Sequence, residues 1–150
     1  MTGVPDRIRI ELGDITRLEV DAIVNAANSS LLGGCPPGEA RLTRGYRLPA
    51  PHVIHTVGPV WRGGGAGEAE ILAGCYRSCL RIAIDRRFRT IAFPAIATGV
   101  YGFPRKRAAE IAVAAVHAHL QGEEHPQSVL FVCFDEATRA AYRQALGLGQ

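Results

Sequence analysis

The feature that most constrains this chain is a glycine-containing loop between a strand-length apolar run and a helical pattern. The apolar run at residues 90–94 leads directly into residues 95–104, which read Ala-Ile-Ala-Thr-Gly-Val-Tyr-Gly-Phe-Pro, and a helical pattern begins at Arg105. Glycine lets the backbone approach a phosphate, and a following helix N-terminus favours negative charge. The same residues are equally compatible with an ordinary tight turn, so both interpretations stay open at this point.

Two asparagines near the end of an earlier strand add a second candidate site. Residues 13–16 read Gly-Asp-Ile-Thr after a short apolar strand, and Asn25 and Asn28 follow the apolar residues 22–24. A side-chain amide can donate and accept together, which suits the hydroxyl pair of a ribose. Asparagine is also common in turns, because it tolerates left-handed backbone. The turn interpretation is favoured for Asn25, whereas both interpretations remain for Asn28.

Strand and helix patterns alternate along the second half of the chain. Strand candidates lie at residues 7–11, 22–24, 40–43, 53–57, 90–95 and 129–134. Stripes at helical spacing predict helices at residues 72–83, 108–120 and 137–145, the last capped by Asp135. Right-handed crossovers then imply a parallel region in an α/β sheet. Cys75 and Cys79 belong to the first stripe, so we interpret them as core residues and expect no metal site.

The composition is that of one small globular domain. The 150 residues are 47% hydrophobic, with a mean hydropathy of +0.06, which predicts a single folded domain over residues 1–150. No apolar stretch exceeds strand length, and the first residues lack the apolar run of a secretion signal. The four cysteines contain no Cys-x-x-Cys pair. We therefore expect a reduced, cytoplasmic protein without a membrane partner.

The positive charge of this chain is carried almost entirely by arginine. The net charge is +3, and Lys106 is the only lysine beside sixteen arginines. Such a balance attracts a polyanion or a diphosphate. No pattern of stacking aromatic residues accompanies the arginines, so a nucleic-acid partner is disfavoured.

Five segments, taken together and in order, resemble the macrodomain family. They are residues 13–16, residues 24–28 with Leu-Leu-Gly-Gly at 31–34, residues 53–59, residues 93–104 and residues 132–136. The similarity is to the branch of bacterial O-acetyl-ADP-ribose deacetylases and mono-ADP-ribosylhydrolases. It implies an α/β, three-layer fold with a mixed central sheet of about six strands and helices on both faces. It also implies ADP-ribose or O-acetyl-ADP-ribose as ligand, ADP-ribosylated proteins as further partners, and no cofactor.

The resemblance assigns a role to each part of the site. Asp14 would accept from the adenine amino group while the Ile15 N–H faces the ring, although capping of the next turn is an alternative for Asp14. Phe134 would lie against the adenine, and Tyr101 would cover the proximal ribose. Asn28 would hold the ribose next to the scissile bond as the one catalytic candidate. The complete expected ligand-binding set is Asp14, Ile15, Asn28, Gly33, Gly34, Ala97, Thr98, Gly99, Val100, Tyr101 and Phe134.

Four histidines and a run of glycines have no expected role in ligand binding. His55 lies in an apolar strand and is expected to be a satisfied core histidine, whereas His117, His119 and His125 are expected at the surface. The glycine-rich residues 63–67 are expected to form a solvated connection, because no strand precedes them.

The chain departs from this branch directly after Gly34. The family continues there with a further loop and a helix, but here Cys35 follows at once. The absent piece carries the aspartate that the family uses to position the attacking water, and Gly38 stands where simple counting would place it. Ala97 also replaces a common serine.

This departure leaves three alternatives for the chain: a hydrolase, a reader that binds without turnover, and a poorly folded domain. In the last case a continuous junction would expose apolar sheet surface beside Val24 and Ile54.

Overall fold

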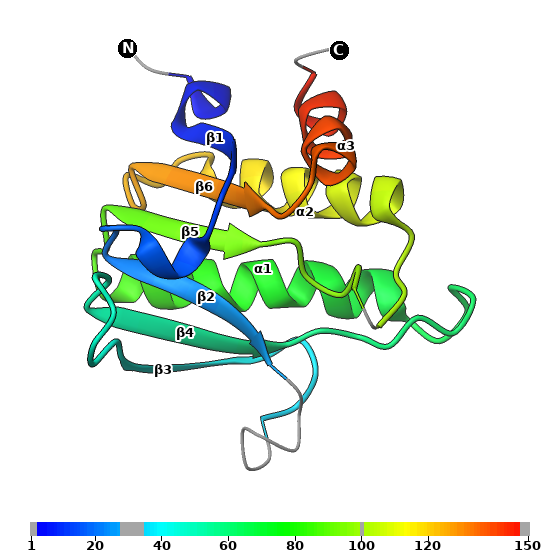
Figure 1. Ribbon diagram of the computed structural model, residues 1–150, viewed down its shortest axis with the longest axis horizontal. Coiled ribbons are helices and arrows are strands. Elements are labelled where there is room, and N and C mark those ends of the chain that lie inside the picture. Colours follow the sequence, from blue (N-terminus) through cyan, green and yellow to red (C-terminus); the bar gives the residue numbers. More distant parts are fainter. Residues whose placement is uncertain (1–2, 28–34, 100, 148–150) are drawn as a thin grey trace.

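A six-stranded mixed sheet forms the centre of the computed structural model, which describes residues 3–27, 35–99 and 101–147 (Figure 1). The strand order is β1-β6-β5-β2-β4-β3, with β3 antiparallel to β4 at one edge and every other pair parallel. The strands are β1 (Ile8–Leu12), β2 (Ala22–Ala27), β3 (Ala40–Arg44), β4 (His52–Val57), β5 (Thr90–Pro94) and β6 (Ser128–Cys133). All six predicted strands are confirmed.

One strand is longer than the sequence predicted. β2 continues through Asn25 to Ala27, where a turn was favoured at Asn25, so that prediction was wrong. Asn25 lies in register with His55 of β4. The weak strand propensity of asparagine is overridden here by pairing with the neighbouring strand, as tertiary context commonly does.

Three α-helices pack on one face of this sheet. They are α1 (Glu68–Asp85), α2 (Arg105–Leu120) and α3 (Glu136–Leu146), and α1 and α2 lie behind the sheet in Figure 1. All three contribute buried residues to one core cluster with Val24, Ile54, Phe93 and Phe131. The rings of Tyr76 and Phe93 lie 4.9 Å apart, a distance typical of packed aromatic pairs. The predicted helical stripes are therefore confirmed.

The opposite face is covered by shorter pieces of chain. A second buried cluster joins Ile23, Val53, Ala92 and Val132, packed against residues of the 3-10 helix η2 (Ile15–Arg17) and of the loops after it and before β4. A further 3-10 helix, η1 (Val4–Arg7), precedes β1. In the described ranges, no α-helix contributes to the second cluster. The third layer is thus thin on this side.

The expected exposure beside Val24 and Ile54 was wrong. Their side chains are only 2% and 0% exposed. Successive residues of a strand point to opposite faces, and these two point toward α1, not toward the thin layer. The junction at Gly34 lies outside the described residues.

The four cysteines are buried and free, and Cys75 and Cys79 belong to the core, as expected. The Cys75 thiol donates to the Val57 carbonyl at 3.2 Å, and burial raises the pKa of Cys79 well above its usual range. No helix in the described part of the chain is long and apolar enough to cross a membrane.

Candidate functional site

A cavity of about 280 Å³ lies where the parallel strands end. The strands β2, β4 and β5 run in the same direction, so the residues that follow them meet at one edge of the sheet. Open α/β sheets bind ligands at this edge. The lining residues are Ala26, Ala27, Gly58, Ala95, Ile96, Ala97, Gly99 and Tyr101.

Gly58 allows the end of β4 to approach the loop after β5. A Cβ at this position would lie 2.9 Å from the Ile96 Cγ2 and 3.3 Å from the Ala97 Cβ. The first distance is below normal van der Waals contact, so only glycine fits without a shift. The sequence pattern did not single out Gly58, although a glycine directly after a buried strand was a usable signal.

The loop after β5 is fixed by backbone hydrogen bonds. The Phe103 N–H donates to the Ala97 carbonyl at 2.9 Å, and the Trp61 N–H donates to the Tyr101 carbonyl at 2.8 Å. Ala97 has a φ of +68°, a left-handed conformation that costs energy for a residue with a Cβ. Such strain persists where surrounding structure imposes it, and it concentrates at binding sites.

Donors in this loop remain available for a ligand. Among the described residues, the N–H groups of Thr98 and Gly99 donate to no other protein group. Gly99 lines the cavity, and a Cβ added to it would meet nothing within 4 Å. An anion placed beside Gly99 would therefore find space, backbone donors and the start of α2 nearby.

Asp14 and Phe134 lie on the same edge but do not line the cavity. Asp14 accepts hydrogen bonds from the Thr16 N–H at 2.9 Å and the Thr16 hydroxyl at 2.6 Å. These bonds lower the pKa of the Asp14 carboxyl. The capping alternative is thus present, and since a carboxylate offers several acceptor positions it leaves room for a further donor. Phe134 is 97% exposed, so its ring is free to stack.

The structure brings only part of the expected set together. Ala97, Gly99 and Tyr101 line the cavity, and Thr98 belongs to the same loop. Ile15, the residue after Asp14, is the first residue of η2 and is half-buried. The remaining expected residues, Asn28, Gly33, Gly34 and Val100, lie outside the described residues.

The histidines differ in part from expectation. The two ring nitrogens of His55 lie 3.3 Å from the Asn25 amide nitrogen and 2.8 Å from the Thr43 hydroxyl. His55 is therefore satisfied, as predicted, but it is half-buried, not part of the core, and burial lowers its pKa. His117, His119 and His125 were expected at the surface but are half-buried.

The glycine-rich connection is organised by a carboxylate that the sequence reasoning missed. Glu68, at the start of α1, accepts from the N–H groups of Arg62 at 2.7 Å, Gly64 at 2.9 Å and Ala66 at 2.7 Å. These hydrogen bonds lower the pKa of Glu68 to about 2. The loop is thus a backbone anion site filled by the protein's own side chain, which excludes it as a ligand site.

The cavity offers binding groups but little acid–base chemistry. Tyr101 is its only titratable lining residue among those described. The described residues also contain no group of three or more histidine, cysteine or acidic side chains that could hold a metal ion. The arrangement suits recognition of an anionic ligand by backbone donors.

Similar proteins share both the sequence and the fold. A macro domain-containing protein of Mesorhizobium japonicum is 49% identical, over 97% of this chain and 97% of its own length. An O-acetyl-ADP-ribose deacetylase of Klebsiella pneumoniae is 50% identical, over 90% of this chain and 93% of its own. The first alignment spans 170 positions against the 150 residues of this chain, so at least 20 of them have no counterpart here.

A solved structure has a similar fold over most of this chain. The Trypanosoma brucei macrodomain in complex with ADP-ribose matches with a TM-score of 0.85 and 36% identity, over 95% of this chain and 70% of that one. The family model for the Macro domain matches residues 3–112. This chain therefore belongs to the macro domain family.

Proposed function

We propose that this chain binds ADP-ribose at the strand-end cavity. The observation that carries the proposal is the loop after β5, where the backbone N–H groups of Thr98 and Gly99 have no partner among the described residues and Gly99 lies beside open space. The diphosphate would accept from these donors, because successive N–H groups in a loop before a helix favour an anion. The complex of the related Trypanosoma brucei macrodomain with ADP-ribose supports the choice of ligand.

The two ends of the ligand would leave the cavity in different directions. At about 280 Å³ the cavity is at the small end for ligand pockets, so it suits the diphosphate and one ribose. The adenine would extend along the open edge between Asp14 and Phe134. Tyr101 would cover the proximal ribose, and Asn28, with Gly33 and Gly34, would approach the distal ribose. In this proposal residues 1–150 act as one domain.

Turnover is the second part of the proposal, and we expect it to be impaired. Relatives at about 50% identity are O-acetyl-ADP-ribose deacetylases, which favours a hydrolase of that compound or of ADP-ribosyl esters as the parent activity. Such hydrolysis needs a group that positions or deprotonates a water. No carboxylate lines the described part of the cavity, and the aspartate that the family resemblance implies belongs to the absent segment. Binding without turnover, as a reader of ADP-ribosylated proteins in the cytoplasm, is the alternative.

Two measurements in sequence separate these functions. Calorimetric titration with ADP-ribose tests binding, and a deacetylation assay with O-acetyl-ADP-ribose then tests turnover. Binding with slow or absent turnover is the expected result. Absence of binding would overturn the proposal, whereas turnover as fast as in the Klebsiella pneumoniae relative would overturn the impairment.

An insertion tests the cause of the impairment. The corresponding segment of a deacetylase relative, placed between Gly34 and Cys35, should raise turnover because it returns the missing aspartate. The same insertion with that aspartate replaced by asparagine is the control, and it should leave turnover low.

A further inference from the structure

A second hollow, separate from the strand-end cavity, lies between β3 and α1. It has a volume of about 490 Å³ and shares no lining residue with the strand-end cavity. Its lining residues are Glu39, Ala40, Arg41, Arg77, Ser78, Arg81, Ile82 and His119. We name it the β3–α1 groove.

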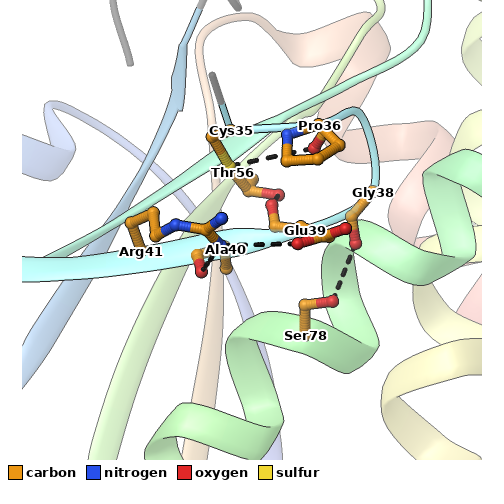
Figure 2. Close-up of polar contacts among 8 residues, drawn as sticks. All are labelled: Cys35, Pro36, Gly38, Glu39, Ala40, Arg41, Thr56 and Ser78. Carbon is orange, nitrogen blue, oxygen red and sulfur yellow. Dashed lines mark hydrogen bonds and ion pairs between the residues drawn. The ribbon is translucent and has the colours of Figure 1, made fainter. Parts of the chain in front are cut away.

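The walls of this groove are held in place by polar contacts. Ser78 of α1 donates to the Gly38 carbonyl at 2.7 Å, and the Thr56 hydroxyl donates to the Glu39 carbonyl at 2.7 Å (Figure 2). The Arg41 guanidinium donates to the Ala40 carbonyl at 3.0 Å, which turns it back along the edge of the sheet. The hydrogen bonds tie the chain before β3 to both α1 and β4, so the groove is a defined surface.

Arginine and histidine side chains converge on the groove from three elements. Arg77 and Arg81 are four residues apart on α1 and therefore project from the same side of the helix. Arg41 comes from β3, and His119 comes from the end of α2. Glu39 is the one acidic lining residue, 3.5 Å from Arg41. Glu70 pairs with Arg77 at 2.5 Å, whereas Arg81 forms no ion pair with any described residue.

His119 supplies an unused polar atom in this setting. Its Nε2 is buried and has no hydrogen-bond partner among the described residues. A buried polar atom without a partner is costly and calls for an explanation. Burial, then the charges of Arg81 and Arg77, lower the pKa of His119, while Glu123 opposes them. Arg77, Arg81 and His119 all line the same groove.

We propose that the β3–α1 groove binds the phosphate groups of a small phosphorylated molecule. Arg81 and Arg77 would form charge-assisted hydrogen bonds to the phosphate oxygens, with the ring of His119 beside them. The volume fits a small-molecule ligand. No phenylalanine, tyrosine or tryptophan is among the described residues that line the groove, which disfavours single-stranded nucleic acid as the occupant.

This site is remote from the ADP-ribose cavity. α2 starts at Arg105, directly after the loop that lines the cavity, and His119 lies near its other end. At 1.5 Å per residue, about 20 Å of helix separates the two positions. A ligand in the groove would therefore not compete directly with ADP-ribose for the cavity.

Tripolyphosphate is a suitable probe. Its binding is monitored by NMR on the whole chain in the absence of ADP-ribose. The His119 ring signals, which are assigned with the variant His119→Gln, report binding in the groove. The Gly99 amide signal reports binding in the cavity independently. We expect a saturable shift of the His119 signals together with a rise in the pKa of His119, because a bound anion stabilises the imidazolium. Arg81→Gln and Arg77→Gln should each weaken this binding about tenfold.

Arg86→Gln is the matched control, since it removes the same charge from the exposed end of α1 outside the groove. It should leave the affinity unchanged. A His119 shift that does not saturate, or an equal loss of affinity in Arg86→Gln, would show general ion attraction and overturn the proposal. Saturable binding of an RNA oligonucleotide without saturable binding of tripolyphosphate would also overturn it.

Discussion

The Gly13 N–H donates a hydrogen bond to the Cys133 carbonyl at 3.2 Å. This bond continues the parallel pairing of β1 with β6, where Leu12 lies opposite Cys133. It brings the residue after each partner, Asp14 and Phe134, to neighbouring positions on the strand-end edge. In the proposed complex with ADP-ribose, an acceptor for the adenine amino group and a ring for stacking would come from opposite ends of the chain.

Phe134→Ala should weaken ADP-ribose binding by about 1–3 kcal/mol through loss of base stacking. The free energy of unfolding should not change, because the ring is 97% exposed. Calorimetry and thermal melting measure the two effects. Tyr46→Ala is the control, since Tyr46 is an exposed ring in the loop before β4, at the opposite edge of the sheet. Equal affinities for Phe134→Ala and the unmodified chain would contradict the adenine position.

Gly99→Val should abolish most ADP-ribose binding and leave the melting temperature almost unchanged. The added side chain enters open space beside the proposed phosphate position, so it strains no described neighbour. Gly65→Val is the matched control, because its added Cβ also meets nothing within 4 Å but lies in the loop held by Glu68. Unchanged affinity in Gly99→Val would place the phosphates elsewhere.

Gly58→Ala should destabilise the fold and distort the cavity together. The new Cβ would press on Ile96 and Ala97, and overpacking of this kind costs about 1–3 kcal/mol. Urea unfolding gives the stability and ADP-ribose titration gives the affinity. A variant as stable as the unmodified chain would contradict the close approach of β4 to the loop after β5.

Glu68 should make the stability depend on pH in the acid range. Its pKa is lowered from 4.5 to about 2 by the loop N–H groups, so the charged form stabilises the folded state. That contribution is fully present above pH 4.5 and is lost as the pH falls from 4.5 toward 2. Glu68→Gln should lower the melting temperature at pH 7 and flatten its decline in this range. An equally steep decline in the variant would assign the acid sensitivity to other groups.

The sequence predicted the elements of the fold better than their contacts. The strand candidates and the helical stripes located the six strands and three α-helices of the described residues, since such patterns reflect burial against the sheet. The face that each strand residue occupies was harder to assign. Val24 and Ile54 were expected to be exposed to solvent, yet both pack in the cluster that contains residues of α1. The residue pattern of a strand does not show which face of the sheet the connecting helix will cover.

The part of the candidate site that consists of backbone groups could be predicted from the sequence. The glycine-containing loop after β5 was identified from its residue types, and it lines the cavity. Glu68 and Gly58 were missed for a different reason. Their roles depend on contacts with residues in other segments or loops, such as Ile96 for Gly58, and such contacts leave no period or motif in the sequence.

The most direct test of the central claim is an NMR titration of the chain with ADP-ribose, read from the backbone amides. The account predicts saturable shifts at Thr98, Gly99 and Tyr101, accompanied by shifts at Asp14 and Phe134, with the amides around Arg81 unchanged. Absence of saturable shifts, or shifts confined to residues away from the strand-end edge, would contradict it.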